Sequence, residues 1–296
     1  MLQGVFTALP TPFLTDGTLD KENLCKLLEA QLKAGVHGVV LLGTTAETPA
    51  LTAADKKTIL DLCVPLIKKH GAQLIIGVGT NNTPATQENI RQAAPYQPNA
   101  VLVVTPYYNK PNPSGLLAHY QACAQEGIPL VLYHIPGRTG LKVPTAVLNM
   151  LLEKIPQLIA VKESDYDIAH VTDVAVLHAK RISYLCGNDD LFPQFLALNG
   201  AGIISAAASV LAPAFVKIYN LFKAGKTQES FAAFAQAYPL IKACYLETNP
   251  TCIKYMLEKL AFGSQTVRAP LGEISAEHKA QIDTLLKQTP KEFLIK

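Results

Sequence analysis

The sequence lacks the features that mark secreted, membrane and disulfide-bonded proteins. None of its six cysteines forms a C-x-x-C pair, and several lie in apolar stretches, which favours buried free thiols over disulfides or metal ligands. The first residues have neither the basic nor the apolar region of a signal peptide. No apolar run approaches the ~18 residues of a membrane span. We therefore expect a protein of the reducing cytoplasm with no membrane association.

Several catalytic and binding motifs are also missing. The formal net charge is only +3 and no basic run is interleaved with aromatic residues, so we expect no nucleic-acid partner. The seven histidines show no metal-ligand spacing, and no G-x-S-x-G nucleophile elbow occurs. The segment 77–79 lacks the third glycine of a dinucleotide-binding turn. We therefore expect neither a metal nor a bound cofactor.

Apolar segments of strand length recur through the 296 residues, and helical patterns separate them. Uninterrupted apolar runs are typical of parallel strands buried on both faces. Eight strands alternating with eight helices predict a (β/α)8 TIM barrel over residues 1–225, with extra C-terminal helices over 226–296 packed on it. The predicted strands are 4–9, 38–42, 74–78, 100–104, 130–133, 158–164, 182–185 and 202–205.

One lysine stands out at the end of the sixth predicted strand. The run from Leu158 to Val161 is apolar and leads directly into Lys162. Burial disfavours a charged ammonium, and a neutral amine can attack a ketone to form a Schiff base. The ordinary alternative is that Lys162 extends from the strand end into water.

Other polar residues follow the predicted strands where a barrel carries its chemistry. A Schiff base forms by loss of water, which needs a proton donor and acceptor within about 3 Å of the carbonyl oxygen. Tyr133, one strand before Lys162, suits that role, and Thr44 and Tyr108 could pass protons to it. Each of these residues alone also has a structural explanation as a turn or core residue. Their shared expected location supports the catalytic interpretation.

Four motifs then resemble the dihydrodipicolinate synthase family, also called 4-hydroxy-tetrahydrodipicolinate synthases. These motifs are Gly-Thr-Thr-Ala-Glu at 43–47, Thr-Pro-Tyr-Tyr-Asn at 105–109, the segment 133–140 and Val-Lys-Glu at 161–163. The resemblance implies a Schiff-base lyase on a (β/α)8 barrel. Such an enzyme condenses pyruvate with L-aspartate 4-semialdehyde in diaminopimelate and lysine biosynthesis.

The resemblance also implies residue roles. Lys162 would carry the imine with pyruvate and replace any separate cofactor. Tyr133, Thr44 and Tyr108 would form a proton relay, with Tyr108 supplied by a neighbouring subunit. Members are usually homotetramers built as pairs of tight dimers.

Substrate contacts follow from the same resemblance. Thr45 would bind the pyruvate carboxylate, and Arg138 would hold the carboxylate of the semialdehyde, for which a guanidinium fork is suited. Gly187 and Ile204 would line the site through their backbones.

The sequence departs from the family pattern at several positions. Ala46 stands where glycine is common, His134 where asparagine is common, and Asn188 where aspartate is common. These departures bear on substrate positioning and leave the imine chemistry intact.

A second group of departures concerns feedback inhibition. Lysine-sensitive members use two histidines and a glutamate at the positions that correspond here to Ala53, Lys56 and Ala85. Asn81 and Tyr107 remain, which indicates a vestigial effector site. We therefore expect lysine to inhibit weakly or not at all.

Two further interpretations stay open at the level of the sequence. N-acetylneuraminate lyases and keto-deoxy sugar-acid aldolases share the lysine and the tyrosine, but they usually lack the arginine found here at Arg138. A non-catalytic barrel that binds a small acid would form no imine at Lys162.

Overall fold

The computed structural model describes residues 1–296, and its eight parallel strands close into a barrel in the order β1 to β8. The predicted fold class is therefore confirmed. The chain divides into two compact units, which we call unit 1 (1–3 and 74–203) and unit 2 (4–73 and 204–296). The divisions fall at the start of β3 and in the middle of β8.

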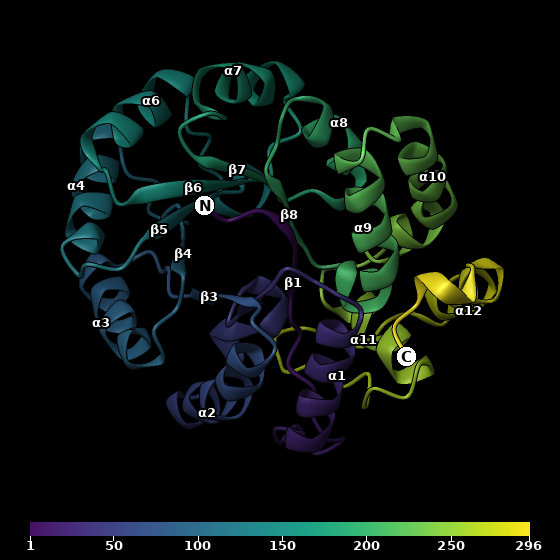
Figure 1. Ribbon diagram of the computed structural model, residues 1–296. Helices are drawn as coiled ribbons and strands as arrows, with labels where there is room; N and C mark the ends of the chain where they lie inside the picture. Colours follow the sequence, from purple (N-terminus) through teal and green to yellow (C-terminus); the bar gives the residue numbers. More distant parts are fainter. The chain divides into compact units, whose positions relative to one another are not determined.

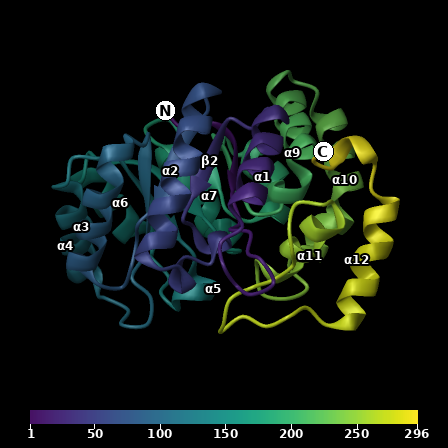
Figure 2. The same ribbon diagram turned by 90° about the horizontal axis from the view of Figure 1, so that it is seen from below.

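Unit 1 holds the strands that carry Tyr133 and Lys162. In Figures 1 and 2 its helices α3, α4 and α6 follow one another outside these strands, and neighbouring helices pack together. Its elements are β3 (Gln73–Gly77, of which Gln73 belongs to unit 2), α3 (Thr83–Ala93), β4 (Ala100–Val104), α4 (Pro113–Ala124), β5 (Leu130–His134), α5 (Pro136–Thr139), α6 (Thr145–Lys154), β6 (Leu158–Glu163), α7 (Ile168–His178), β7 (Ser183–Cys186), α8 (Phe192–Ala197) and the first half of β8 (Gly202–Ser205).

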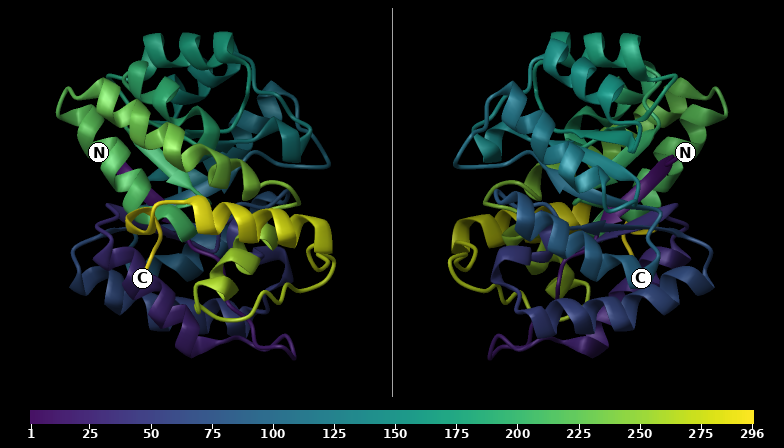
Figure 3. Two further views of the ribbon diagram at one scale, coloured as in Figure 1. Left: turned by 90° about the vertical axis from the view of Figure 1, so that its right-hand side faces the viewer. Right: turned by 90° about the vertical axis from the view of Figure 1, so that its left-hand side faces the viewer.

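Unit 2 contains the first two strands and all the C-terminal helices. Helix α10 packs on α9 and α12, and α12 also packs on α11, an arrangement visible in Figure 3. Its elements are β1 (Gly4–Ala8), α1 (Lys21–Lys33), β2 (Gly38–Leu41), α2 (Ala53–Lys69), the second half of β8, α9 (Ala208–Lys223), α10 (Thr227–Ala243), α11 (Thr251–Lys259) and α12 (Ala276–Gln288).

The strands are buried on both sides, as their apolar sequences predict. Every residue of β1, β2, β5, β7 and β8 is buried. Polar side chains cap some of the helices: Asp20 accepts the Asn23 N–H at the start of α1, and Thr52 forms a capping box with Asp55 at the start of α2. Such caps satisfy amide groups that have no partner inside the helix. No helix is long and apolar enough to cross a membrane.

The predicted limits of β1, β2, β3, β6 and β7 differ from the observed ones by one residue, and two local assignments were wrong. His134 was assigned to a loop but is the last residue of β5. The segment 136–139 was also taken as loop and forms one helical turn, α5, which ends at Gly140 in the left-handed conformation (φ +65°).

Candidate active site

Lys162 lies near the carboxyl end of β6 in unit 1. Its side chain is only 7% exposed, and its Nζ lies 4.1 Å from the centroid of the Tyr133 ring. The two residues are paired in the register of β5 and β6, so their side chains leave the sheet on the same side. An ammonium over an aromatic face is attracted to it, which holds the amine beside the tyrosine.

Gly187 leaves room for the stem of Lys162. A Cβ atom at Gly187 would lie 2.1 Å from Ser164 Oγ, 2.9 Å from the carbonyl oxygen of Glu163 and 3.1 Å from Lys162 Cε. The Gly187 N–H also donates to the Glu163 carbonyl oxygen at 2.7 Å, so the two strand ends are joined directly. A side chain at this position would therefore press on the lysine.

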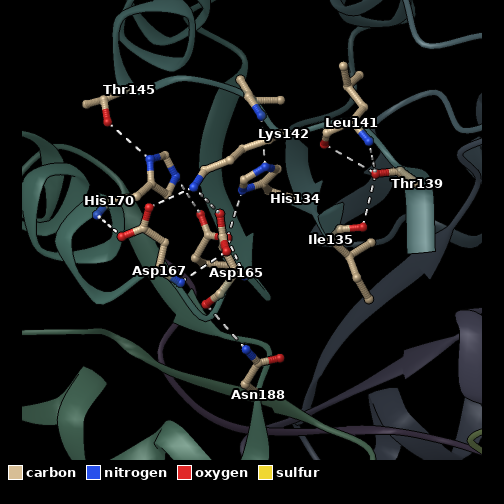
Figure 4. Close-up of polar contacts among 12 residues, drawn as sticks. His134, Ile135, Thr139, Leu141, Lys142, Thr145, Asp165, Asp167, His170 and Asn188 are labelled. Carbon is tan, nitrogen blue, oxygen red and sulfur yellow. Dashed lines mark hydrogen bonds and ion pairs between the residues drawn. The ribbon is translucent and has the colours of Figure 1, made fainter. Parts of the chain in front are cut away.

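The segment that carries Arg138 is compact, and Arg138 itself is exposed. The Thr139 hydroxyl donates to the Ile135 carbonyl at 3.0 Å and lies 3.3 Å from the Leu141 carbonyl, as Figure 4 shows. The loop after β4 lies beside it, because a Cβ at Gly140 would be 2.8 Å from Lys110 Cε. The loops after β4 and β5 therefore meet.

The loop after β4 presents two tyrosines to solvent. Tyr107 is 37% exposed and Tyr108 is 89% exposed. Tyr108 also has a φ of +69°, a conformation that is uncommon for a bulky residue and costs about 1–3 kcal/mol. The neighbouring Asn109 side chain donates to the Asn81 carbonyl at 2.8 Å, which connects this loop to the loop after β3.

Unit 2 carries Thr44, Thr45 and Ile204. Thr44 and Thr45 lie in a short 3-10 turn (Thr44–Ala46) after β2, and Ile204 is buried in β8. Buried Thr45 accepts a hydrogen bond from the Asn249 side chain at 3.0 Å. Sequence reasoning did not identify Asn249, which stands 204 residues away along the chain.

A buried ion pair supports the same turn and was also missed. Glu47 has a left-handed backbone (φ +56°), and its carboxylate contacts Lys254 Nζ at 2.5 Å. The second carboxylate oxygen accepts the Arg268 N–H at 2.8 Å. Burial lowers the pKa of Lys254 to about 8, although the Glu47 charge opposes this shift. The pair ties the Gly-Thr-Thr-Ala-Glu segment to α11.

Unit 1 contains a buried cluster that the sequence did not indicate. Glu163 is fully buried and accepts from His134 Nδ1 at 2.8 Å, while His170 Nε2 lies 3.4 Å from its other oxygen. Although burial opposes it, the hydrogen bond from His134 and the nearby His170 ring lower the pKa of Glu163. The only sequence signal was that His134 and Glu163 directly follow Tyr133 and Lys162 on neighbouring strands.

Part of this cluster has the composition of a metal site. Ligand atoms of His134, Asp165 and His170 lie within 4.8 Å of one another, although the sequence spacing suggested no such group. Both nitrogens of His134 already have hydrogen-bond partners, Glu163 and the Val143 N–H. The Lys142 ammonium lies 3.6 Å from Asp165. These contacts favour a hydrogen-bonded network over a metal centre.

The chain matches one protein family along nearly its whole length. The model of the dihydrodipicolinate synthetase family covers residues 1–289. A 4-hydroxy-tetrahydrodipicolinate synthase from Protochlamydia amoebophila is 36% identical over 299 residues, covering 99% of this chain and 98% of its own.

Solved structures agree with that match. The crystal structure of dihydrodipicolinate synthase from Thermotoga maritima has a TM-score of 0.94 and 31% identity, covering 98% of this chain and 99% of its own. A monomeric dihydrodipicolinate synthase variant matches with the same TM-score and identity, covering 97% of each chain. The chain therefore belongs to the dihydrodipicolinate synthetase family.

Proposed function

We propose that Lys162 forms a Schiff base with pyruvate and that the resulting enamine adds to L-aspartate 4-semialdehyde, as in a 4-hydroxy-tetrahydrodipicolinate synthase. The observation that carries the proposal is the buried Lys162 amine, held over the Tyr133 ring at the end of β6. The family match and the names of the relatives support the same activity.

The chemistry requires protons to move at several steps. The neutral Lys162 amine attacks the pyruvate carbonyl, and the carbonyl oxygen leaves as water once it has been protonated. Loss of a proton from the adjacent methyl group gives the enamine, whose carbon forms the new bond to the aldehyde carbon. We assign Tyr133 as the group that gives and takes these protons, with Thr44 and Tyr108 as its relay.

We assign the substrate contacts from the family pattern. Thr45 would bind the pyruvate carboxylate, and its hydrogen bond from Asn249 would orient it. Arg138 would bind the carboxylate of the semialdehyde as a planar fork. Gly187 and Ile204 would contribute backbone groups, which suits the close approach of Gly187 to Lys162.

We further propose that the chain acts in the cytoplasm as a homotetramer, a dimer of dimers. Its six cysteines are free thiols, which is typical of proteins of reducing compartments. Tyr108 extends into solvent with an unfavourable backbone conformation, as expected for a residue that completes the site of a neighbouring subunit. Because one similar structure is monomeric, the mass in solution should be measured directly.

Reductive trapping tests the proposed mechanism. Borohydride reduction in the presence of pyruvate should add the pyruvoyl group to the peptide that contains Lys162, and Lys162→Ala should abolish the adduct. An unmodified protein, or modification of another lysine, would contradict the mechanism. A non-catalytic barrel predicts no adduct at all.

Substrate comparison tests the specificity. We expect turnover of pyruvate with the semialdehyde to exceed cleavage of N-acetylneuraminate or a keto-deoxy sugar acid. Arg138→Ala should weaken use of the semialdehyde while pyruvate trapping is largely retained. Faster cleavage of a sugar acid would instead identify a sugar-acid aldolase, and loss of trapping in Arg138→Ala would contradict the role given to Arg138.

A further inference from the structure

The buried cluster of His134, Glu163 and His170, which we call the histidine–glutamate cluster, lies on the side of β5 and β6 opposite to Lys162. Side chains alternate along a strand, and His134 pairs with Glu163 one position after Tyr133 pairs with Lys162. His170 is on α7 and lies 3.1 Å from the Thr145 hydroxyl at the start of α6. The cluster therefore joins two strand ends to two helices (Figure 4).

Hydrogen bonds fix the tautomer of His134. The Val143 N–H donates to Nε2 at 3.0 Å, so Nε2 must present its lone pair. The proton is then on Nδ1, which donates to Glu163 at 2.8 Å. Glu163 also accepts the Asp165 N–H at 2.8 Å, which holds the loop after β6 against the same carboxylate. One imidazole thus connects Glu163 to the backbone of Val143, nine residues after His134.

These bonds close the loop that carries Arg138. The loop leaves the sheet at His134, and at Val143 its backbone N–H donates to the ring of His134. Next to Val143, Lys142 binds Asp167 at 2.7 Å and lies 3.6 Å from Asp165 (Figure 4). The His134 side chain therefore joins the two ends of the loop, because it lies at one end and binds the backbone of Val143 at the other.

We propose that His134, held by Glu163 and His170, is a positioning residue that sets the place of the Arg138 loop and thereby the affinity for the semialdehyde. This inference rests on the proposed function, because it gives Arg138 a substrate to bind. His134 stands where asparagine is common in the family, and the proposal gives this difference a role in recognition of the semialdehyde. The proton relay and the imine lie on the other side of the sheet and are unaffected.

Two substitutions separate the two bonds of His134. Asparagine has polar atoms where histidine has Nδ1, so His134→Asn can keep the bond to Glu163 and loses the bond to Val143. Glutamine has polar atoms where histidine has Nε2, so His134→Gln can keep the hydrogen bond to Val143 and loses the hydrogen bond to Glu163. His119→Asn is the matched control, since His119 is another buried histidine of unit 1 whose Nδ1 binds Thr83 at 2.9 Å.

Steady-state kinetics with both substrates provide the main test. Loss of one buried hydrogen bond should raise the KM for the semialdehyde by about 5- to 10-fold in His134→Asn. The KM for pyruvate and the rate of borohydride trapping should stay at wild-type values, as should all three quantities in His119→Asn. Hydrogen exchange of the peptide 135–144 should be faster in His134→Asn than in the control.

A double-mutant cycle distinguishes positioning from general loosening. In an Arg138→Ala background, His134→Asn should cause no further rise in the KM for the semialdehyde, because the loop then has no group to position. A wild-type KM for the semialdehyde in His134→Asn, or an equal rise for pyruvate, would overturn the inference. If His134→Asn does not fold, His134→Gln must show the same selective rise, and its absence would overturn the inference as well.

Failure of the role proposed for His134 can be distinguished from failure of the proposed function. If wild-type protein forms no pyruvate adduct or does not use the semialdehyde, the proposed function fails. If both activities are present and the substitution leaves the two KM values in their wild-type ratio, only the role of His134 fails.

Discussion

Gly187→Ala should slow imine formation because the new methyl group would press on Lys162. It would lie 2.1 Å from Ser164 Oγ, 2.9 Å from the Glu163 carbonyl oxygen and 3.1 Å from Lys162 Cε, so the Ser164 hydroxyl must also turn away. The backbone cannot move away freely, since the Gly187 N–H donates to the Glu163 carbonyl oxygen at 2.7 Å. Overpacking of this kind costs about 1–3 kcal/mol in the free energy of unfolding. For 296 residues this corresponds to a fall in Tm of about 2–5 °C.

The effect on the reaction should be larger than the effect on stability suggests. A misplacement of a reacting group by 1 Å costs about 10²-fold in rate. The contact between the new methyl group and Lys162 Cε is too short by only a few tenths of an ångström, so the amine is displaced by less than that. We therefore expect borohydride trapping of pyruvate to slow by roughly 10-fold. The assay is the time course of adduct formation by mass spectrometry, with Tm measured on the same samples.

Gly272→Ala is the matched control for this substitution. No atom lies within 4 Å of a Cβ at Gly272, and its φ is not in the left-handed region. It should trap pyruvate at the wild-type rate with an unchanged Tm. A wild-type trapping rate in Gly187→Ala would refute the reasoning, and so would an equal slowing in both variants.

Four further predictions concern other parts of the molecule. Tyr133→Phe should reduce turnover by ~10²–10³ with an unchanged circular dichroism spectrum, because it removes the proton handler; unchanged turnover would exclude Tyr133 from the mechanism. Lys254→Met should lower the free energy of unfolding, measured by urea titration, by about 3–5 kcal/mol, because the Glu47 charge stays buried without its partner. Adding Glu47→Gln to this variant should recover much of the lost free energy. The ion pair with Glu163 raises the pKa of His170, so the stabilising effect of this pair is complete below about pH 6.5 and is lost as the pH rises through the raised value. His170→Gln should remove this part of the Tm profile, and an identical profile would contradict the prediction. Lysine at sub-millimolar concentration should inhibit turnover weakly or not at all, because Lys56 would repel the effector's ammonium, and strong inhibition would disprove this.

The sequence by itself determined the barrel and placed every strand limit within one residue of the observed one. Parallel strands buried on both faces read as short apolar runs, so β4 and β8 were predicted with their observed bounds. The location of Lys162 followed as well, because an apolar run that meets a polar residue also marks the strand end. The turn α5 escaped prediction because four residues with a proline and a glycine carry no helical period.

Only the tertiary structure decided which polar groups meet. Glu47 and Lys254 are 207 residues apart, and Thr45 and Asn249 are 204 apart, so no local pattern connects them. His134 and Glu163 come together because β5 and β6 pair in a register that also aligns Tyr133 with Lys162. Burial then gives these contacts their strength, since polar groups removed from water must find partners within the protein.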